Sequence, residues 1–408
     1  MSSHPEIPAS EQPVSHELGA TAYGRHPAVG NLPLSQVGPG SQCGEFLRRY
    51  WHPVALSSDA GPRPRKVKIL GEDLVLFRDK SGRPGLLYPR CMHRGTSLFY
   101  GRVEERGIRC CYHGWLYDVR GNCLDQPCEP DGGRHRDKTR QPWYPVQERY
   151  GLVFAYLGPP GKIPQLPRYE ILEDLQPGER IACDDGSRFG QHGDSGMPIL
   201  PYTWLHTQEN FMDPFHVYVL HSTFTVQQFA EGFSVMPEVD FEYIPGGIIY
   251  KARRKLDDGR KMTRISCLLI PNVASVPDVE LSPSRSSSIS WIVPVDDTHH
   301  QGFRAIRTRE PSDEVLFKPL VYGDKTWNQM TPEERRDVPG DFEAQGGQGP
   351  LTLNSEEHLG TSDRGIIMLR RLMLKQLAAV AGGDDPMGVI FDPDRAMLSM
   401  PSGNFYGG

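Results

Sequence analysis

Four residues in the first third of the chain combine thiolate and imidazole side chains at short spacings. Cys91 and His93 form a Cys-x-His pair, and Cys110 and His113 form a Cys-x-x-His pair sixteen residues further on. Two short loops that face each other can present two sulfurs to one iron and two nitrogens to the other iron of a [2Fe–2S] cluster. The spacing therefore predicts such a cluster. Because two neutral histidines replace two thiolates, its reduction potential would exceed that of an all-cysteine cluster.

A zinc site with two cysteines and two histidines is the competing interpretation. Zinc-finger spacing groups cysteine with cysteine and histidine with histidine, whereas the two residue types alternate here. The neighbouring Gly95, Gly114 and Trp115 are also more typical of Rieske loops. Respiratory-chain Rieske proteins are similar but add one cysteine to each loop, where this chain has Thr96 and Tyr112. The pattern without that disulfide resembles the Rieske domains of bacterial oxygenases and ferredoxins.

A second group of possible metal ligands lies in the segment ENFMDPFHVYVLH, residues 209–221. It contains Asp213, His216 and His221. A regular α-helix turns by roughly 140° over the five residues between the two histidines. For both to reach one metal, the helix must either widen to a π-type turn or end between them, a distortion often found at functional sites. Two histidines and one carboxylate form the facial triad of non-haem Fe(II) oxygenases.

The carboxylate predicted to complete this triad is Asp363. It lies near the start of a predicted helix over His358–Ala381, after the possible caps Thr361 and Ser362. A negative charge is favoured there by the helix dipole. Each part of this site has a structural alternative, because paired histidines often serve packing and an aspartate near a helix start is commonly a cap. The combination with the cluster motif favours the metal site.

The elements that must position these residues fall into two groups. Short β-like runs between Val54 and Val153 predict an all-β domain, and the rest of the chain mixes strands and helices. The fold class is therefore α+β, with an extended arm over 1–40, a cluster domain over 41–165 and a catalytic domain over 166–408. Further predicted elements are a helix at 41–51 capped by Ser41, a helix at about 204–220, strands at 239–249, 264–273, 287–295 and 301–309, and a Gly-rich loop at 340–350.

Composition excludes several classes of protein. The 408 residues carry a net charge of −6, which argues against a nucleic-acid partner. The sequence has no apolar run of the length that spans a membrane, and its first residues lack the pattern of a signal peptide. We therefore expect a cytoplasmic protein. Eight cysteines without an export signal favour metal ligation over a disulfide framework.

Together these motifs resemble the oxygenase component of Rieske non-haem iron oxygenases over roughly residues 40–400. The segments GPGSQCGEFLRRYWHPVAL and GQGPLTLNSEEHLGTSDRGIIMLRR are similar to the branch that contains phthalate dioxygenase, vanillate and dehydrodivanillate O-demethylases and phenoxybenzoate dioxygenase. The resemblance implies helices on an antiparallel sheet in the catalytic domain, homotrimers or stacked trimers, a mononuclear Fe(II), and electrons from NAD(P)H through a separate reductase, with or without a ferredoxin. It also implies that Asp213 bridges an iron-ligating histidine and His113 of a neighbouring subunit, and that Asn210 lies near the iron.

The expected substrates are O2 and a small aromatic acid or aryl ether, which the family dihydroxylates or O-demethylates. Four apolar residues after the histidine segment could line a substrate pocket or simply pack in the core: Phe224, Phe229, Phe233 and Met236. Three arginines could bind a substrate carboxylate or be solvated strand charges: Arg304, Arg307 and Arg309. The alternative function is a Rieske electron-transfer protein without oxygenase chemistry, against which the second group of metal ligands argues.

Overall fold

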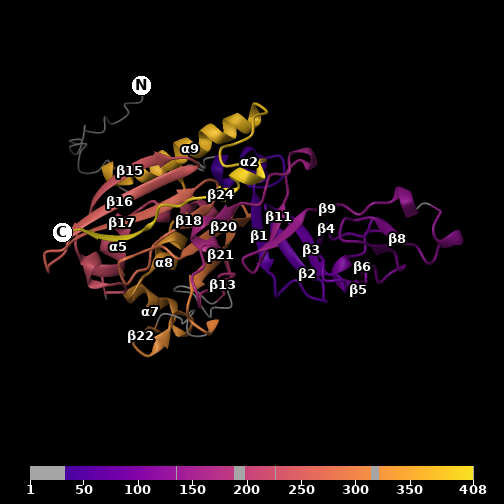
Figure 1. Cartoon of the computed structure of the whole chain (residues 1–408), viewed down its shortest axis with the longest axis horizontal. Helices are drawn as coiled ribbons and strands as arrows, with labels where there is room; N and C mark the ends of the chain where they lie inside the picture. The colour runs from indigo at the N-terminus through magenta and orange to yellow at the C-terminus, as the bar shows by residue number, and fades with distance from the viewer. Residues whose placement is uncertain (1–32, 135, 188–197, 226, 314–320, 408) are drawn as a thin grey trace, which may run out of the picture.

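The structure is a computed structural model that describes residues 33–134, 136–187, 198–225, 227–313 and 321–407 (Figure 1). Residues 1–32 of the predicted N-terminal arm lie outside the described residues. The end of the arm does not extend away from the molecule. A 3-10 turn, η1 (Pro33–Ser35), buries Leu34, whose carbonyl accepts a hydrogen bond of 3.0 Å from the indole N–H of Trp204. This part of the arm is therefore packed into the core.

The predicted helix at residues 41–51 is α2 (Gln42–Leu47). Ser41 caps it as predicted, because its Oγ accepts a hydrogen bond of 3.0 Å from the N–H of Gly44. α2 packs against α9 (Arg364–Ala381) at the other end of the sequence. The first helix of the chain therefore contacts the C-terminal part of the molecule.

The strands up to residue 156 form three small antiparallel sheets, which confirms the predicted all-β domain. The first sheet has the order β1-β11-β10, the second β2-β3-β4-β9 and the third β5-β6-β7-β8. Figure 1 shows the third sheet at the far end of the long axis of the molecule. The strands are β1 (Trp51–Leu56), β2 (Arg65–Ile69), β3 (Glu72–Arg78), β4 (Pro84–Leu87), β5 (Arg102–Glu104), β6 (Gly107–Arg109), β7 (Leu116–Tyr117), β8 (Cys123–Asp125), β9 (Trp143–Tyr144), β10 (Val146–Arg149) and β11 (Leu152–Tyr156).

The rest of the chain is built on one large antiparallel sheet. Its main order is β13-β21-β20-β18-β17-β16-β15, and β14, β19 and β25 pair at its sides. The strands are β13 (Arg180–Asp184), β14 (Ile199–Leu200), β15 (Glu238–Ile244), β16 (Gly247–Lys255), β17 (Lys261–Leu269), β18 (Val273–Ser275), β19 (Ser284–Arg285), β20 (Ser288–Asp296), β21 (His299–Thr308) and β25 (Gly403–Gly407). Short pairs outside it are β12 (Arg168–Tyr169) with β24 (Met397–Leu398), and β22 (Val321–Tyr322) with β23 (Lys325–Thr326).

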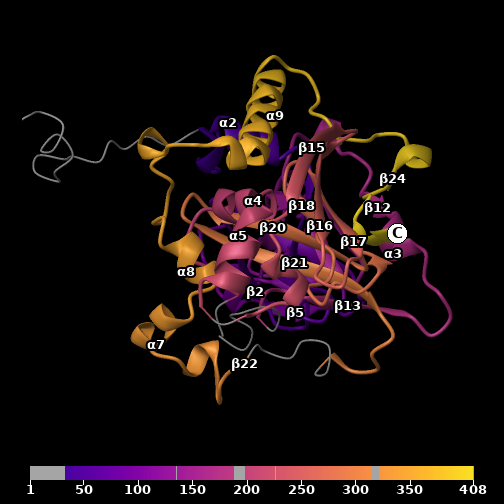
Figure 2. The same ribbon diagram turned by 90° about the vertical axis from the view of Figure 1, so that its left-hand side faces the viewer.

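Helices cover this sheet, so the predicted α+β architecture is confirmed. α4 (Trp204–Phe211) packs against β20 and β21, and it also contacts α9 and α8 (Asp341–Gly346). Figure 2 shows α4 and α5 (Phe215–Tyr218) in front of the sheet and α9 above them. The other helices are α3 (Glu170–Glu173) and α7 (Pro332–Asp337). Across the described ranges, no helix combines the length and apolar character needed to cross a lipid bilayer.

Several predicted elements have different boundaries in the structure. The predicted strand at 239–249 is the hairpin β15–β16, because Pro245 and Gly246 form its turn. The predicted strand at 264–273 corresponds to β17 and β18. The prediction of a loop at 340–350 was wrong, since α8 occupies its first half. The long helix starts later than predicted, at Arg364, and ends as predicted at Gly382, where Gly383 has a φ of +94°.

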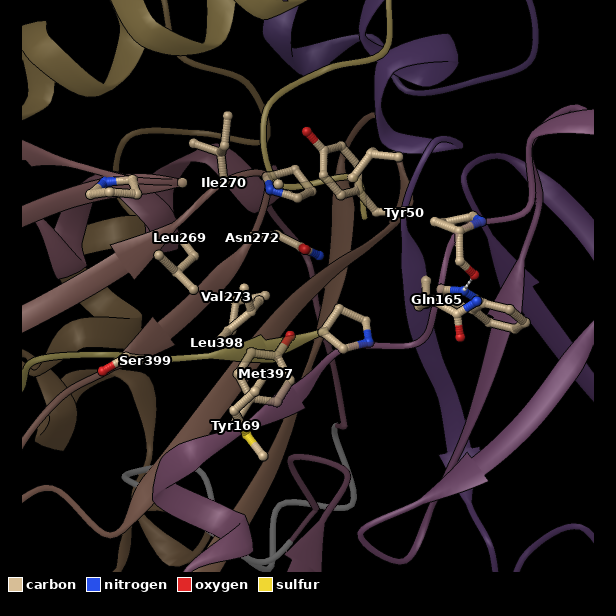
Figure 3. A pocket seen from close by; sticks show the side chains of 18 of the residues that line it. Tyr50, Gln165, Tyr169, Leu269, Ile270, Asn272, Val273, Met397, Leu398 and Ser399 are labelled. Atoms are coloured by element: carbon tan, nitrogen blue, oxygen red, sulfur yellow. Dashed lines mark hydrogen bonds between the residues drawn. The ribbon is translucent and has the colours of Figure 1, made fainter. Parts of the chain in front are cut away.

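A cavity of about 430 Å³ lies at the junction of the two parts of the chain (Figure 3). Its walls come from β1, the linker after β11, the β17–β18 turn and the segment around β24. Among the lining residues, the indole N–H of Trp51 donates to the carbonyl of Pro164 over 2.9 Å. Among the described residues, no predicted metal ligand lines this cavity. The cavity is therefore separate from the predicted metal sites.

Candidate metal centres

The Cys-x-His and Cys-x-x-His motifs lie on two loops with the same backbone hydrogen bonds. In the first loop the N–H of Cys91 donates to the carbonyl of Thr96 over 2.9 Å, and the N–H of Gly95 donates to the carbonyl of Cys91 over 2.8 Å. In the second loop Cys110 bonds to Trp115 over 2.9 Å and Gly114 to Cys110 over 3.1 Å. The two glycines have φ values of +77° and +74°, which only glycine adopts at little cost. The sequence thus builds two matching tight turns.

These turns bring the four predicted cluster ligands to one end of the β5–β8 sheet. The rings of His93 and His113 lie with centroids 4.6 Å apart, and His93 stacks on Trp115 at 4.5 Å with an interplanar angle of 4°. Cys91 and Cys110 are both buried free thiols. The hydroxyl of Tyr117 lies 3.3 Å from the sulfur of Cys91, where a hydrogen bond to a cluster sulfur raises the reduction potential.

The environment of His113 supports the assignment of these four residues to a [2Fe–2S] cluster. The Nδ1 atom of His113 is buried and has no hydrogen-bond partner among the described residues. A buried imidazole nitrogen without a partner is costly unless it serves as a ligand. Zinc-type grouping is absent from the two loops, because each loop supplies one thiol and one imidazole.

The second histidine pair lies on a broken helix. α4 ends at Phe211, and the segment Met212–Pro214 separates it from α5, which carries His216. The next five residues, η6 (Val219–Thr223), form a π-helix that carries His221. Of the two predicted alternatives, a π-type turn or a helix end between the histidines, the structure has the π-type turn. The prediction of one continuous helix from about 204 to 220 was wrong. A proline cannot continue the hydrogen bonding of a helix interior, which explains the break before α5.

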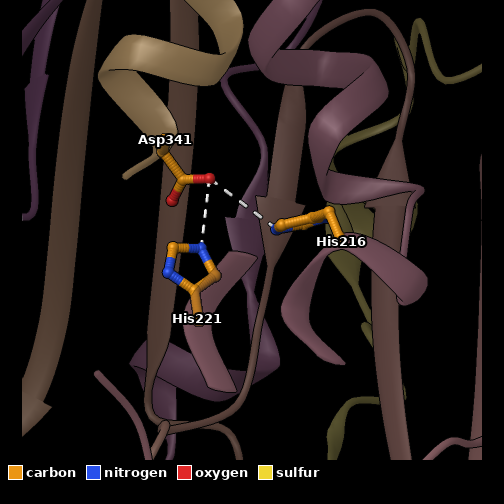
Figure 4. A group of neighbouring side chains, drawn as sticks. All are labelled: His216, His221 and Asp341. Carbon is orange, nitrogen blue, oxygen red and sulfur yellow. Dashed lines mark hydrogen bonds and ion pairs between the residues drawn. The ribbon is translucent and has the colours of Figure 1, made fainter. Parts of the chain in front are cut away.

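His216 and His221 converge on a carboxylate from α8 (Figure 4). Nε2 of His221 lies 3.3 Å, and Nε2 of His216 3.7 Å, from Oδ1 of Asp341. Their potential ligand atoms all lie within 4.8 Å of one another. Ligand atoms placed about 2 Å from a metal are roughly 3–3.5 Å apart, so the group needs little adjustment to hold one ion. Burial raises the pKa of Asp341, but the two histidines outweigh this effect and hold that pKa well below its usual range.

The structure does not place the predicted third ligand, Asp363, with the two histidines. The carboxylate of Asp363 accepts a hydrogen bond of 2.6 Å from the backbone N–H of Gly360, at the turn before α9. Asp363 is therefore a cap, and it is not part of the group formed by His216, His221 and Asp341. Asp341 was not predicted as a ligand, because the glycines of residues 340–350 are typical of a loop. The available signal was a capped helix start, since Glu343 accepts from the N–H of Gly340 over 3.0 Å.

Three further side chains orient the converging group. Nδ1 of His221 lies 2.8 Å from Oε1 of Gln228, which fixes the tautomer that presents Nε2 to Asp341. The amide of Asn210 donates to Oδ1 of Asp341 over 3.1 Å, which places Asn210 beside the site as the resemblance implied. Oδ2 of Asp213 lies 3.6 Å from Nδ1 of His216. Burial raises the pKa of Asp213, but its interaction with His216 more than offsets this and leaves it lowered.

The helix that carries Asn210 is held by a buried ion-pair network. Arg370 of α9 donates to both carboxylate oxygens of Glu209 on α4, over 2.5 and 2.8 Å. It also donates to both oxygens of Glu357, over 2.6 and 2.8 Å.

At the start of α9, a Cβ on Gly365 would lie 2.6 Å from the carbonyl oxygen of Met212. A glycine is therefore required where α9 passes the loop between α4 and α5.

The predicted substrate-pocket residues divide between two environments. The ring of Phe229 lies 4.2 Å from that of His221, and Phe233 is buried beside Phe229 at 5.8 Å. Phe224 and Met236 are exposed. The three arginines, two on β21 and Arg309 just after it, contact other groups. Arg307 donates to the carbonyl of Asp174 and pairs with Glu179, Arg309 pairs with Glu179, and Arg304 donates to Ser288.

Comparisons with known proteins agree with this arrangement of two metal centres. Residues 50–145 match the family model of the Rieske [2Fe-2S] domain. The chain is 56% identical over 394 residues to the phenoxybenzoate dioxygenase subunit alpha of Ectopseudomonas oleovorans, covering 96% of each chain. It is 34% identical to the 5,5'-dehydrodivanillate O-demethylase oxygenase subunit of a Sphingobium species, covering 89% of this chain and 83% of that one.

A solved structure shares the fold. The NdmA QL mutant of Pseudomonas putida CBB5 with theobromine superposes with a TM-score of 0.62 at 22% identity, covering 86% of this chain and 98% of that chain. The fold and both sites define a protein with a Rieske domain and a separate mononuclear metal centre. The chain belongs to the oxygenase (alpha) components of the Rieske non-haem iron oxygenases. It is a terminal oxygenase that carries a [2Fe–2S] cluster and a mononuclear iron and uses O2 and reductase-supplied electrons.

Proposed function

We propose that the enzyme oxidises an aromatic carboxylic acid of the phenoxybenzoate type at an iron held by His216, His221 and Asp341. The observation that carries this proposal is the convergence of two Nε2 atoms and one carboxylate oxygen within 4.8 Å. Two histidines and one carboxylate leave several positions on Fe(II) open for O2. The substrate class follows from the 56% identity to a phenoxybenzoate dioxygenase subunit. Cys91, His93, Cys110 and His113 are proposed to hold the cluster.

Each neighbouring side chain has a distinct task in this proposal. When bound, the iron supplies the activation of O2, and the cluster supplies electrons to it one at a time. Gln228 holds His221 in the tautomer that ligates through Nε2. Asn210 fixes the orientation of the Asp341 carboxylate. Phe229 lies beside His221 and provides an apolar wall for an aromatic ring.

The metal content tests the proposal directly. Protein purified without oxygen is expected to contain about three irons and two acid-labile sulfides per chain, two of the irons in the cluster. Chelation of the mononuclear iron should abolish aromatic-dependent O2 uptake, and added Fe(II) should restore it. The substrate class is tested in the same assay by comparing phenoxybenzoate with methoxylated benzoates. Two irons per chain and no O2 uptake after Fe(II) addition would instead identify an electron carrier.

We further propose that the active unit is a homotrimer in the cytoplasm, where NAD(P)H supplies the reductase. Within one chain, Figure 1 shows the β5–β8 sheet and α5 far apart along the long axis. A neighbouring subunit is therefore better placed to bring its cluster to the iron. Tyr112, beside His113, is 56% exposed and Met92 49% exposed, so the cluster end offers an uncovered apolar surface. Asp213 would join His216 to His113 of the neighbouring subunit.

Replacing Asp213 by asparagine is expected to slow turnover about 10- to 100-fold with both metal centres intact. Oδ1 of Asp213 accepts from the backbone N–H groups of Phe215 and His216, and an asparagine oxygen can keep these bonds. Its amide would place a donor instead of an acceptor beside Nδ1 of His216. Stopped-flow reoxidation of the reduced cluster measures the effect. Asp240→Asn, on exposed β15, is the control, and equal rates in both variants would contradict the bridging role.

A further inference from the structure

Two buried arginines lie on neighbouring strands beneath the histidine helices. Arg254 of β16 and Arg264 of β17 are each only 4% exposed. In the register of the sheet Arg254 is opposite Met262, and Arg264 is opposite Ala252. Because side chains alternate along a strand, both arginines lie on the same face. Tyr250, two pairs further along that face, packs beside Phe241.

This face is the one that carries the metal-ligand helices. Phe241 lies against the start of α9, where a Cβ on Gly365 would meet both its ring and the backbone of Met212, just before Asp213. The guanidinium groups of Arg254 and Arg264 each lie 5.2 Å from the centroid of the Phe233 ring. Phe233 contacts Phe229, which contacts His221. A continuous row of aromatic rings therefore connects the proposed iron site to the two arginines.

The two arginines differ in their partners. Arg264 donates to the carbonyls of Asp278 and Pro277, each over 2.7 Å, and to the side chain of Asn404 over 2.9 Å. Arg254 donates through Nε to the carbonyl of Val235 over 2.9 Å. Among the described residues its Nη1 is buried without a hydrogen-bond partner, and its guanidinium forms no ion pair with a carboxylate.

Within the described part of the chain, Arg254 is thus a buried cation without a carboxylate partner. The pKa of Arg254 is lowered to about 10, mainly by burial; Tyr250 opposes this lowering and the nearby charge of Arg264 adds to it. The side chain stays charged at neutral pH. A buried charge without a partner is strongly unfavourable, so an anion that reaches Nη1 would gain a charge-assisted hydrogen bond. Such positions destabilise the free protein and are retained where they serve binding.

We propose that Arg254 binds the carboxylate of the aromatic substrate, while Phe229 and Phe233 contact its rings between Arg254 and the iron. This role of Arg254 rests on the proposed function and extends it, because it names the residue that selects an aromatic acid over a neutral aromatic compound. It assigns the selection to β16, and not to the arginines on β21, which are engaged by Asp174, Glu179 and Ser288.

Binding of phenoxybenzoate and of its neutral amide to the iron-loaded enzyme tests the proposal. In the wild type we expect the acid, but not the amide, to raise the melting temperature and to bind at least tenfold more tightly. Arg254→Gln should weaken acid binding about 10- to 100-fold and change amide binding less than about threefold. Arg254→Lys should recover part of the acid binding. Arg253→Gln, on the exposed face of β16, is the matched control and should bind as the wild type does.

The stability of the free variants provides a second readout. Because Arg254→Gln removes an unpaired buried charge, its melting temperature without ligand should equal or exceed that of the wild type. A large loss of stability, or an equal loss of acid and amide binding, would make Arg254 a structural residue and overturn the proposal. Equal binding of acid and amide by the wild type would also overturn it. The proposed oxygenase function is tested separately by aromatic-dependent O2 uptake. Uptake with a neutral aromatic substrate would support that function even if Arg254 did not bind a carboxylate.

Discussion

Replacing Asp341 by asparagine is expected to remove the mononuclear iron and lower turnover by more than about 100-fold, while the Rieske spectrum stays unchanged. Loss of a residue that merely orients a ligand costs about 10- to 100-fold in metal affinity or activity, and loss of a charged ligand should cost more. Oδ1 of Asp341 lies within 3.3 Å of Nε2 of His221 and 3.7 Å of Nε2 of His216. A neutral amide there leaves Fe(II) with two neutral imidazoles and no negative charge.

The matched control is Asp363→Asn, which removes a carboxylate at the residue that the sequence alone favoured. Asp363 accepts from the N–H of Gly360, and an asparagine oxygen can accept the same bond. Iron content and turnover should therefore remain within about twofold of the wild type, as for most surface substitutions. Iron per chain, the visible spectrum of the cluster and O2 uptake measure both variants. Iron loss in Asp363→Asn together with full iron in Asp341→Asn would contradict Asp341 as the third ligand and favour Asp363.

The difference between these two aspartates shows which part of the site the sequence could predict. The cluster ligands and the two histidines occur in short segments, where spacing alone limits the geometry. The five-residue step from His216 to His221 required either a widened turn or a helix end, and the structure has a widened turn in η6. The third ligand that we propose, Asp341, comes from α8, 120 residues beyond His221. No local period connects them, so only the packing of α8 against α4 brings Asp341 to the histidines.

The fold divides in the same way. The short strands and the final helix were predicted, because their patterns are local. In α9, Leu369, Leu372, Met373, Gln376 and Val380 all lie buried on one face. The hairpin at Pro245–Gly246 and the break at Pro214 were missed although both carry a proline, a strong local signal. Helix α8 was missed because its glycines are typical of loops, whereas acidic residues in its first turn favour a helix start.

The second large effect is expected from Arg370→Ala, which should destabilise the catalytic part by about 3–5 kcal/mol. Arg370 forms paired hydrogen bonds with Glu209 and with Glu357, and Glu209 is 6% exposed. Burial already raises the pKa of the Glu209 carboxyl with Arg370 in place. Without the guanidinium, two carboxylates would face each other with no cation between them, and one must take up a proton or gain water. The helix α4 that leads to the metal ligands would lose its main polar contact with α9.

Thermal unfolding followed by circular dichroism measures this effect. A loss of this size corresponds to a fall of roughly 10 °C in the melting temperature of a part of this length. Arg371→Ala is the matched control, since Arg371 is the next residue of α9 and is exposed, and it should change the melting temperature by less than about 2 °C. Arg370→Lys keeps the charge but cannot form the two paired contacts, so it should fall between these variants. Equal stability of Arg370→Ala and Arg371→Ala would mean that the network contributes nothing to holding α4 against α9, and that the metal ligands depend on apolar packing alone.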